Sequence, residues 1–447
     1  METNPLESLT APANYDLFVF GDSLSDTGHI FRLSGGLFPP PPYFNGRFSN
    51  GAVAVESLAT SLGLGYQTTN FALGGARSGR TNLFDNPAFQ VGGLLDQIDR
   101  FKAQAIPLGA GAEDLYFIWV GANDFLDSSN PDTTATLNTA VANIATAVTT
   151  LAQSGAKNIV VVQTPNLGRT PLAVEQGLLQ PLTQVSLAFN AALASTLTPL
   201  EASLGGANII LADLFAIAEN IAQNPASFGF TDVTTPYVST VFPQNPTADP
   251  SPFFFWDRTH PTTRGHALFA NVLRRDVIAG ITDNVVRIGT AAAERLVGFS
   301  GNDRLRGLAG ADVLEGNAGR DALLGGAGTD VIVGGGGNDQ LTGGEGQDTL
   351  RGGLGADRFI YTAVGDRSDV IGDFQSGRDL IDLRVAFNQP TYAQGDRFAA
   401  YVRVTQLGSD TIVRFDTNGD TLGGFATLAR LSNVVAGTLN ASSFLLG

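Results

Sequence analysis

The feature that most constrains this chain is a nine-residue period that begins at Gly289. In register it gives eight units: GTAAAERLV, GFSGNDRLR, GLAGADVLE, GNAGRDALL, GGAGTDVIV, GGGGNDQLT, GGEGQDTLR and GGLGADRFI. Seven units fit G-G-x-G-x-D-x-U-x, where U is a large apolar residue, and the first carries Glu294 at the aspartate position. A flexible Gly/Asp-rich linker would need neither this register nor an apolar residue at the eighth place. The period therefore predicts a stacked repeat structure.

Each unit divides into a turn and a short strand. The glycines of the first six residues can take backbone angles that other residues resist, which suits a turn. The last three residues should form a very short strand whose central apolar residue points inward. Two units would complete one coil, so aspartates on the same side recur every eighteen residues. One row then holds Asp303, Asp321, Asp339 and Asp357, and the other holds Asp312, Asp330 and Asp348.

These rows of carboxylates predict a divalent cation. Like charges one strand spacing apart repel each other unless hard cations lie between them, with carbonyl oxygens of the turns as further ligands. The units resemble the RTX calcium-binding nonapeptide repeat. This resemblance implies a parallel β-roll that binds Ca²⁺ through the seven aspartates, and we expect it to span residues 284–360.

Residues 1–283 follow a different pattern. Short apolar runs bounded by turn residues predict buried strands, and the longer amphipathic runs between them predict helices. The expected strands are 16–20, 115–120, 158–163 and 208–212, with 66–71 as a weaker fifth, and the expected helices are 52–62, 94–105, 136–153, 181–204 and 262–278. This alternation favours a doubly wound α/β fold, in which helices cover both faces of a parallel sheet. Ligands bind such sheets beyond the carboxyl ends of the strands.

Four segments near those strand ends carry residues that could form a catalytic site. Ser23 lies in FVFGDSLSDTG, glycines lie in NFALGGA at 70–76, and Asn123 lies in VGAND, where its amide could face a developing oxyanion. Singly, the serine could be a helix cap and the other two segments could be ordinary turns. In the fourth segment, FFFWDRTHP, Asp257 and His260 are spaced so that the carboxylate can hold the imidazole with Nε2 toward a serine.

In this order, the four segments resemble the GDSL or SGNH hydrolase superfamily over about residues 15–278. Phospholipase/lecithinase/haemolysin-like and plant-type GDSL esterases share strings such as FVFGDSLSDTG and NGRFSNG. The resemblance implies a flavodoxin-like SGNH hydrolase fold, with Ser23 as nucleophile, Gly75 and Asn123 as oxyanion donors, Asp257 as the orienting acid and His260 as the base. Gly74 stays open as an alternative donor to Gly75. We expect the other histidines, His29 and His266, to be structural.

The implied activity is hydrolysis of carboxylic esters without a cofactor for the chemistry. Apolar residues crowd the segments expected near the site, namely Phe31, 37–43, Phe84, Phe89 and 253–256. They favour an acyl or aryl ester, or a lipid, over a sugar ester, although they could equally be core or lid packing. Two alternatives stay open: a polysaccharide O-acetyl esterase, and a calcium-dependent surface or adhesion protein with an inactive hydrolase domain.

Residues 361–447 form the third expected part, a β-rich segment that includes YVRVTQ and TIVRF. Its string DVIGDFQSGRDLIDL resembles the C-terminal region of RTX exoproteins, which carries an uncleaved type I secretion signal. The first residues, METNPLESLTAPANYD, lack the basic and apolar regions of a Sec signal peptide. We therefore expect a secreted protein that leaves the cell through a type I secretion apparatus, without an N-terminal signal peptide.

Composition sets further limits on partners. The formal net charge is −16, so the chain should repel phosphate backbones, and nucleic acid is not an expected partner. The absence of cysteine excludes disulfides and thiolate metal sites. No apolar run approaches the ~18 residues that would cross a membrane, so we expect no transmembrane segment.

Overall fold

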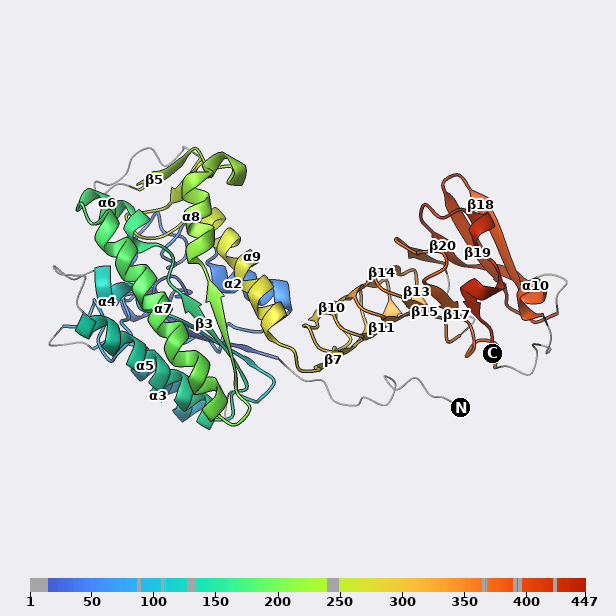
Figure 1. Ribbon diagram of the computed structural model, residues 1–447, viewed down its shortest axis with the longest axis horizontal. Helices are drawn as coiled ribbons and strands as arrows, with labels where there is room; N and C mark the ends of the chain where they lie inside the picture. Colours follow the sequence, from blue (N-terminus) through green and yellow to red (C-terminus); the bar gives the residue numbers. More distant parts are fainter. Residues whose placement is uncertain are drawn as a thin grey trace. The chain divides into compact units, whose positions relative to one another are not determined.

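The computed structural model describes residues 15–447 except 87–89, 106–107, 109, 127–133, 239–248, 364–365, 367, 389–391, 393–395 and 421–423. The described residues form two compact units, residues 15–280 and Ile281–Gly447 (Figure 1). The nine-residue repeats and the C-terminal segment lie in the second unit. The expected domain boundaries at 283/284 and 360/361 stay predictions.

The first unit is built on a parallel sheet with the strand order β1-β2-β3-β4. These strands are β1 (Leu17–Gly21), β2 (Leu115–Trp119), β3 (Asn158–Gln163) and β4 (Asn208–Asp213). Every residue of β1 and β2 is buried, as is typical of parallel strands that are covered on both faces. A separate two-stranded sheet, which the sequence pattern did not predict, pairs β5 (Asp232–Pro236) with β6 (Phe253–Phe255).

The expected fifth strand at 66–71 is not a regular strand. The segment runs beside β1 and forms one isolated parallel bridge with it, between Asn70 and Val19, and the N–H of Phe71 donates to Val19 O at 2.7 Å. In between, the Thr69 hydroxyl donates to Leu17 O at 2.8 Å. A side chain therefore occupies a carbonyl that a ladder N–H would otherwise use, and regular pairing is interrupted.

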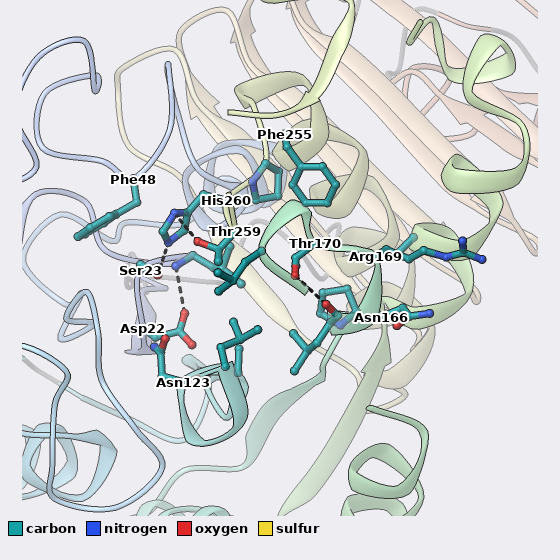
Figure 2. Close-up of a pocket in the computed structure, with 18 of the residues that line it drawn as sticks. Asp22, Ser23, Phe48, Asn123, Asn166, Arg169, Thr170, Phe255, Thr259 and His260 are labelled. Carbon is teal, nitrogen blue, oxygen red and sulfur yellow. Dashed lines mark hydrogen bonds between the residues drawn. The ribbon is translucent and has the colours of Figure 1, made fainter. Parts of the chain in front are cut away.

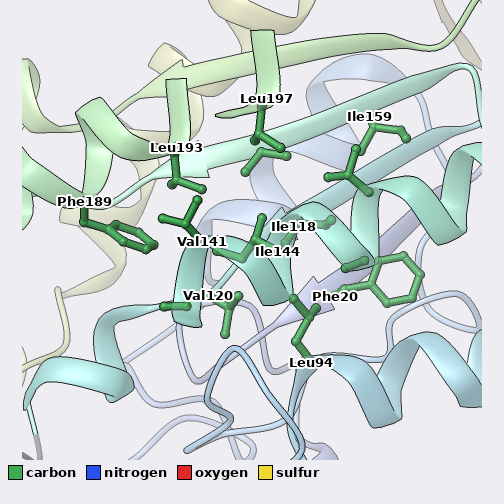
Figure 3. Packing of buried hydrophobic residues seen from close by; sticks show 14 of the residues in the cluster. Phe20, Leu94, Ile118, Val120, Val141, Ile144, Ile159, Phe189, Leu193 and Leu197 are labelled. Atoms are coloured by element: carbon green, nitrogen blue, oxygen red, sulfur yellow. The ribbon is translucent and has the colours of Figure 1, made fainter. Parts of the chain in front are cut away.

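Helices cover both faces of the four-stranded sheet (Figure 1). They are α1 (His29–Leu33), α2 (Ala54–Leu62), α3 (Leu94–Gln104), α4 (Ala122–Leu126), α5 (Thr134–Gln153), α6 (Pro171–Glu175), α7 (Leu179–Ser203), α8 (Phe215–Gln223) and α9 (Thr263–Gly280). On one face, α3, α5 and α7 contribute Leu94, Ile144 and Leu193 to a buried apolar cluster (Figure 3). On the other face, the rings of Phe269 on α9 and Trp119 on β2 lie 6.0 Å apart. The doubly wound α/β fold is confirmed.

The long helices agree with the sequence pattern, and the short ones do not follow from it. The ends of α2, α3, α5, α7 and α9 fall within two residues of the expected bounds. The helices α1, α4 and α6 have five residues each, too few to give a periodic apolar face, and with α8 they were not expected.

The second unit begins with a roll of two parallel sheets. One sheet contains β8 (Arg295–Val297), β10 (Val313–Ala318), β12 (Val331–Gly336), β14 (Thr349–Leu354) and β16 (Asp369–Ile371). The other contains β7 (Val286–Ile288), β9 (Arg304–Ala309), β11 (Ala322–Gly328), β13 (Gln340–Gly346), β15 (Arg358–Ile360) and β17 (Leu380–Asp382). Strands eighteen residues apart pair in register, such as Leu323 with Leu341, so two units complete a coil as expected.

The apolar residue of each unit points into the roll. Leu305, Leu323 and Leu341 are fully buried, as are their counterparts on the facing sheet. The six strands from β9 to β14 have six or seven residues and not the expected three, because pairing continues through the glycines, as between Asn317 and Gly335, whereas β7, β8 and β15 have three. The parallel β-roll is confirmed, with this correction to its strand length.

The C-terminal segment extends both sheets. It adds α10 (Arg397–Tyr401), β18 (Val402–Leu407), β19 (Asp410–Asp416), β20 (Phe425–Leu431) and β21 (Phe444–Leu445). Strand β20 pairs with β16, and strand β21 pairs with β17. Strand β19 pairs antiparallel with β20, and β18 pairs antiparallel with β19. Among the described residues, no helix combines the length and the apolarity needed to cross a membrane.

Candidate active site and cation-binding roll

Ser23, His260 and Asp257 form a continuous hydrogen-bonded series, of which Figure 2 shows Ser23 and His260. His260 Nδ1 lies 2.7 Å from Asp257 Oδ2, and His260 Nε2 lies 2.7 Å from Ser23 Oγ. With the Nδ1 proton donated to the carboxylate, Nε2 can accept the hydroxyl proton of Ser23. The structure thus brings together three residues that the sequence motifs indicated, two of which, Ser23 and His260, lie 237 positions apart in the chain.

Local structure orients these side chains. Ser23 follows β1 at the carboxyl edge of the sheet, where only 8% of its surface is exposed. Asp257 and His260 lie in the turn between β6 and α9. The backbone N–H groups of Thr259 and His260 donate to Asp257 Oδ1 at 2.8 and 2.7 Å, so the turn itself fixes the carboxylate.

The electrostatics of the pair favour an ionised aspartate and a basic histidine. Burial alone would lower the pKa of His260, but the charge of Asp257 and its hydrogen bond outweigh burial and raise that pKa. Burial alone would raise the pKa of Asp257, yet the charge and hydrogen bond of His260 and two backbone N–H groups lower it to about 2. Asp257 is thus charged at neutral pH and can stabilise an imidazolium.

Donors for an oxyanion lie next to Ser23. Gly75 has a φ of 75°, and a Cβ there would lie 2.6 Å from Asn82 Oδ1, so both the backbone angle and the space require glycine. The N–H of Gly74 donates to Asp26 Oδ2 at 2.8 Å. The N–H groups of Ser23 and Gly75 have no acceptor among the described residues. The geometry thus favours Gly75 over Gly74.

Asn123 lies in α4, shortly after the end of β2, and lines the same cavity as Ser23 and Gly75. Its Nδ2 donates one proton to Ala76 O at 3.0 Å, which leaves a second amide proton for a ligand. The neighbouring Asp124 accepts the N–H and hydroxyl of Ser78 at 2.9 and 2.8 Å. These bonds join the VGAND segment to the segment that carries Gly75.

Three further residues support the site, and the sequence motifs did not identify their roles. The Tyr43 hydroxyl donates to Asp257 Oδ2 at 2.8 Å from a segment 214 residues away. The carboxylate of Asp26 accepts the N–H groups of Gly28 and Gly74, so it fixes the glycine segment. Burial raises the pKa of Asp22, beside the serine, to about 7. Only the proximity of Asp22 and Asp26 to Ser23 in the motif could have indicated them.

A largely apolar cavity of about 250 Å³ opens from Ser23. Gly75, Asn123 and His260 line the same cavity. Its apolar lining includes Phe48, Phe84, Leu126, Leu167, Leu172, Ile221, Val233, Phe254 and Phe255. Polar side chains of Asn166, Arg169 and Thr170 also reach it (Figure 2).

The expected apolar rim is partly correct. Phe84, Phe254 and Phe255 line the cavity, and Phe38 lines an adjoining apolar pocket together with Phe84. Phe31 does not line either pocket, and Phe89 lies outside the described residues.

The other two histidines lie apart from this hydrogen-bonded series. His266 on α9 is buried, and its Nδ1 accepts the N–H of Ala54 at 3.2 Å. Burial lowers the pKa of His266 to about 3, so it stays neutral and packs α9 against α2. His29 lies at the start of α1, with Nδ1 3.6 Å from Asp26 Oδ1.

Two family models match the chain. Residues 17–273 match the model described as GDSL-like lipase/acylhydrolase. Residues 297–332 and 324–359 match the RTX calcium-binding nonapeptide repeat. The first match covers more than half of the chain, which therefore belongs to the GDSL-like lipase/acylhydrolase family and carries RTX calcium-binding repeats after that domain. Both resemblances predicted from the sequence are confirmed.

Curated relatives match about half of the chain. A phosphatidylcholine-sterol acyltransferase from Aeromonas hydrophila is 34% identical over 49% of this chain and 64% of its own length. A thermolabile hemolysin from Vibrio parahaemolyticus is 28% identical over 56% of this chain and 60% of its own. The chain thus spans less than two thirds of the length of these relatives.

Solved structures match less closely. An acetylxylan esterase from Geobacillus stearothermophilus is 15% identical, with 60% of this chain and 96% of that chain covered and a TM-score of 0.32.

The repeat aspartates share one bonding pattern that suits a cation. Their Oδ1 accepts the N–H of the residue eighteen positions earlier, which is Val285 for Asp303, Glu294 for Asp312 and an aspartate for the others, as Asp330 Oδ1 accepts from Asp312 at 2.8 Å. Their Oδ2 is buried without a hydrogen-bond partner among the described residues in Asp312, Asp321, Asp330, Asp339, Asp348 and Asp357. Asp303 differs, because the N–H of Phe299 donates to its Oδ2 at 2.6 Å.

Calcium fits these unpartnered oxygens. Burial, reinforced by neighbouring aspartates, raises the pKa of Asp321 to about 8 and that of Asp339 to about 6, so ionising these two carboxylates is costly unless a cation binds them. A Cβ at Gly334 would lie 2.5 Å from Asp339 Oδ2 and 2.7 Å from Gly352 O, so both oxygens face one space. Within the described ranges no three acidic or histidine side chains cluster, so paired carboxylates and turn carbonyls would supply the oxygen ligands that Ca²⁺ prefers.

Proposed function

We propose that the chain is a secreted serine hydrolase that cleaves carboxylic esters with an apolar acyl group. The observation that carries this proposal is the hydrogen-bonded series from Ser23 through His260 to Asp257 at the end of an apolar cavity. Its parts are a hydrolase domain at 1–283, a calcium-binding β-roll at 284–360 and a C-terminal segment at 361–447 with a type I secretion signal.

The mechanism follows from the geometry. His260 Nε2 accepts the proton of Ser23 as Oγ attacks the ester carbonyl, and Asp257 stabilises the resulting imidazolium. The oxyanion of the tetrahedral intermediate would accept hydrogen bonds from the N–H groups of Ser23 and Gly75 and from Asn123 Nδ2. His260 then protonates the leaving alkoxide and activates the water that hydrolyses the acyl-enzyme. No cofactor takes part in these steps.

The surroundings of the site support an apolar substrate. Phe38, 40% exposed, contacts Phe48 at a ring distance of 5.8 Å, and Phe48 contacts His260 at 5.2 Å. Aromatic surface therefore extends from solvent to the proposed base. An acetyl group would contact little of this surface or of the apolar lining, so we expect longer acyl chains to be preferred over acetate.

A panel of chromogenic esters from acetate to long-chain acyl groups tests the proposal. The wild-type chain should hydrolyse medium or long acyl esters fastest, and Ser23→Ala should lower kcat by at least about 10³-fold because the nucleophile is lost. Arg80→Ala, a change at an exposed residue paired with Asp96 and Asp99, serves as the control and should keep the wild-type rate.

The panel also separates the alternatives. Hydrolysis of acetate esters alone would favour a polysaccharide O-acetyl esterase. A wild-type chain that folds and hydrolyses no ester would favour a surface or adhesion protein. Near wild-type turnover by folded Ser23→Ala would reject the assignment of the nucleophile.

Export is proposed from the C-terminal resemblance and the repeats. A chain that ends at residue 360 should stay inside cells that carry a type I secretion apparatus, while cell extracts should still hydrolyse the ester. The comparison is the full chain in the same cells, with ester hydrolysis measured in medium and extract. Equal secretion of both chains would contradict a signal within 361–447.

A further inference from the structure

The carboxylate of Asp257 accepts hydrogen bonds on both of its oxygens, from different parts of the chain. Oδ1 accepts the backbone N–H groups of Thr259 and His260 at 2.8 and 2.7 Å. Oδ2 lies 2.7 Å from His260 Nδ1, and the Tyr43 hydroxyl donates to the same oxygen at 2.8 Å. The turn therefore positions the carboxylate through Oδ1, whereas Tyr43 acts on the oxygen that bonds the imidazole.

Tyr43 is held in place by more than this hydrogen bond. Its ring packs edge-on against the rings of Phe48 and Trp256, with centroids 6.4 and 6.0 Å away. Both of these neighbours are buried. The N–H of Tyr43 also donates to Pro40 O at 3.1 Å. Removal of the hydroxyl alone should therefore leave the ring where it is.

The segment that carries Tyr43 is also bonded to the segment that carries His260. The Ser49 hydroxyl donates to Pro261 O at 2.9 Å, and the N–H of Thr263 donates to Asn50 Oδ1 at 2.8 Å. These two bonds fix the distance between the segments without the help of Tyr43. The Tyr43 hydroxyl is thus not needed to hold them together.

A donor on the shared oxygen changes how strongly Asp257 stabilises a protonated His260. The positive end of the Tyr43 O–H dipole points at Oδ2, next to the Nδ1–H of the imidazole. It draws on the same negative charge that would stabilise the imidazolium. Burial, and then the charge of Asp257 and this bond, raise the pKa of Tyr43 well above its usual value, so the hydroxyl keeps its proton.

Other titratable groups act on His260 from two further elements. Burial lowers the pKa of His260, Asp257 raises it, and Asp22, which follows β1, adds to the increase by its charge. His266 on α9 stays neutral, because burial lowers its pKa to about 3. A change at Tyr43 leaves Asp22 and His266 in place, so their effects cancel when a Tyr43 variant is compared with the wild-type chain.

We propose that Tyr43 is a positioning residue that tunes His260 as a base: by sharing Asp257 Oδ2, it weakens the hold of the carboxylate on the proton that His260 takes from Ser23. His260 then stays neutral, and able to accept that proton, at a lower pH than Asp257 alone would allow. This role rests on the proposed function of Ser23, Asp257 and His260.

The test compares three forms of the full chain. Tyr43→Phe removes the hydroxyl and keeps the ring that packs against Phe48 and Trp256. Tyr66→Phe is the matched control, because the Tyr66 hydroxyl also donates to a carboxylate, Glu56 Oε1 at 3.2 Å, and neither residue lines the cavity. The wild-type chain is the reference.

A pH–rate profile gives the first readout. In Tyr43→Phe the acid limb of kcat/KM should move to higher pH by about 0.5–1 unit, because Asp257 then stabilises the imidazolium more strongly. Below the limb kcat/KM should fall about 3–10-fold, and above it kcat/KM should stay within about twofold of the wild-type value. Tyr66→Phe should keep the wild-type profile. A limb that stays in place or moves to lower pH, or an equal loss at every pH, would overturn the proposal.

Titration of the imidazoles by NMR tests the same point without any ester. The chain has three histidines, so His260→Ala identifies the signals of His260 by their loss. His260 should titrate about 0.5–1 unit higher in Tyr43→Phe than in the wild-type chain. When both chains also carry Asp257→Asn, His260 should titrate alike in the two, because Tyr43 acts through that carboxylate.

The NMR titration also separates this proposal from the proposed function. Equal titration of His260 in Tyr43→Phe and the wild-type chain, or a difference that persists with Asp257→Asn, would overturn the role of Tyr43. The expected shift in a wild-type chain that hydrolyses no ester would uphold the effect of Tyr43 on His260 and reject the proposed function.

Discussion

The two units of this chain bury different groups. In the hydrolase unit, aromatic side chains pack closely in the core, as Phe101 does against Phe18 and Phe20 at ring distances of 5.4 and 5.5 Å. In the roll, seven of the eight nine-residue units each bury one apolar side chain and one aspartate carboxylate. The first interior needs no counter-ion, whereas the second gathers like charges that oppose folding.

This difference explains how the chemistry and the cation can be separated. The groups around Ser23 are positioned by hydrogen bonds and apolar contacts within residues 15–280. Among the described residues, the repeat aspartates from Asp312 to Asp357 each keep a buried carboxylate oxygen without a hydrogen-bond partner. Calcium should therefore govern the order of the roll and leave the geometry of the ester site unchanged.

The largest effect that would sharpen this comparison concerns the oxyanion donor. Asn123→Ala should lower kcat by about 10²–10³-fold with little change in KM, because such a donor acts mainly in the transition state. Steady-state kinetics on the best ester, with calcium titration calorimetry on the same sample, measures both units. A change confined to KM would make Asn123 a substrate-binding residue, and altered calcium binding would break the separation of the units.

Acidification in excess chelator should affect the two units in opposite directions. His260 must be neutral to accept the serine proton, so kcat/KM should rise with pH through its raised pKa and fall about tenfold per pH unit below it. The pKa of Asp321 is raised to about 8 in the folded roll, while an unfolded aspartate titrates near 4. Between these values the folded roll binds more protons than the unfolded chain, so its stability should fall as the pH rises from about 4 to about 8.

The measurement combines a pH–rate profile with the far-UV circular dichroism β signal of the roll, which reports its folded fraction from pH 4 to pH 8, both in EDTA. Excess Ca²⁺ is the control, because bound calcium should keep the aspartates ionised and remove the loss of stability at high pH. A roll that is more stable at pH 8 than at pH 5 in EDTA would contradict the role assigned to the buried carboxylates.

The sequence predicted the elements and residues whose patterns are local or periodic. The apolar runs of β1–β4 and the nine-residue repeat each carry their signal within a few residues, and the four motifs contain Ser23, Asn123, Asp257 and His260. The choice between Gly74 and Gly75 depends on the Asp26 carboxylate, which accepts the N–H of Gly74 across the sheet edge.

The remaining features depend on contacts that no local pattern specifies. Tyr43 bonds Asp257 across 214 residues, and in the sequence it is simply one more apolar residue after four prolines. Segment 66–71 has a strand-like composition, but the Thr69 side chain interrupts its pairing.

The most direct test of the separation is one calcium titration of the full chain, starting in EDTA, with two readouts. Ester hydrolysis reports residues 15–280, and far-UV circular dichroism with limited proteolysis reports the roll. Hydrolysis should persist in EDTA, while the β signal and protection of residues 289–382 should develop as free calcium reaches about 10⁻⁴–10⁻³ M, the range of extracellular calcium modules. A β signal already complete in EDTA, or hydrolysis that rises with the same calcium midpoint as the roll, would contradict the account.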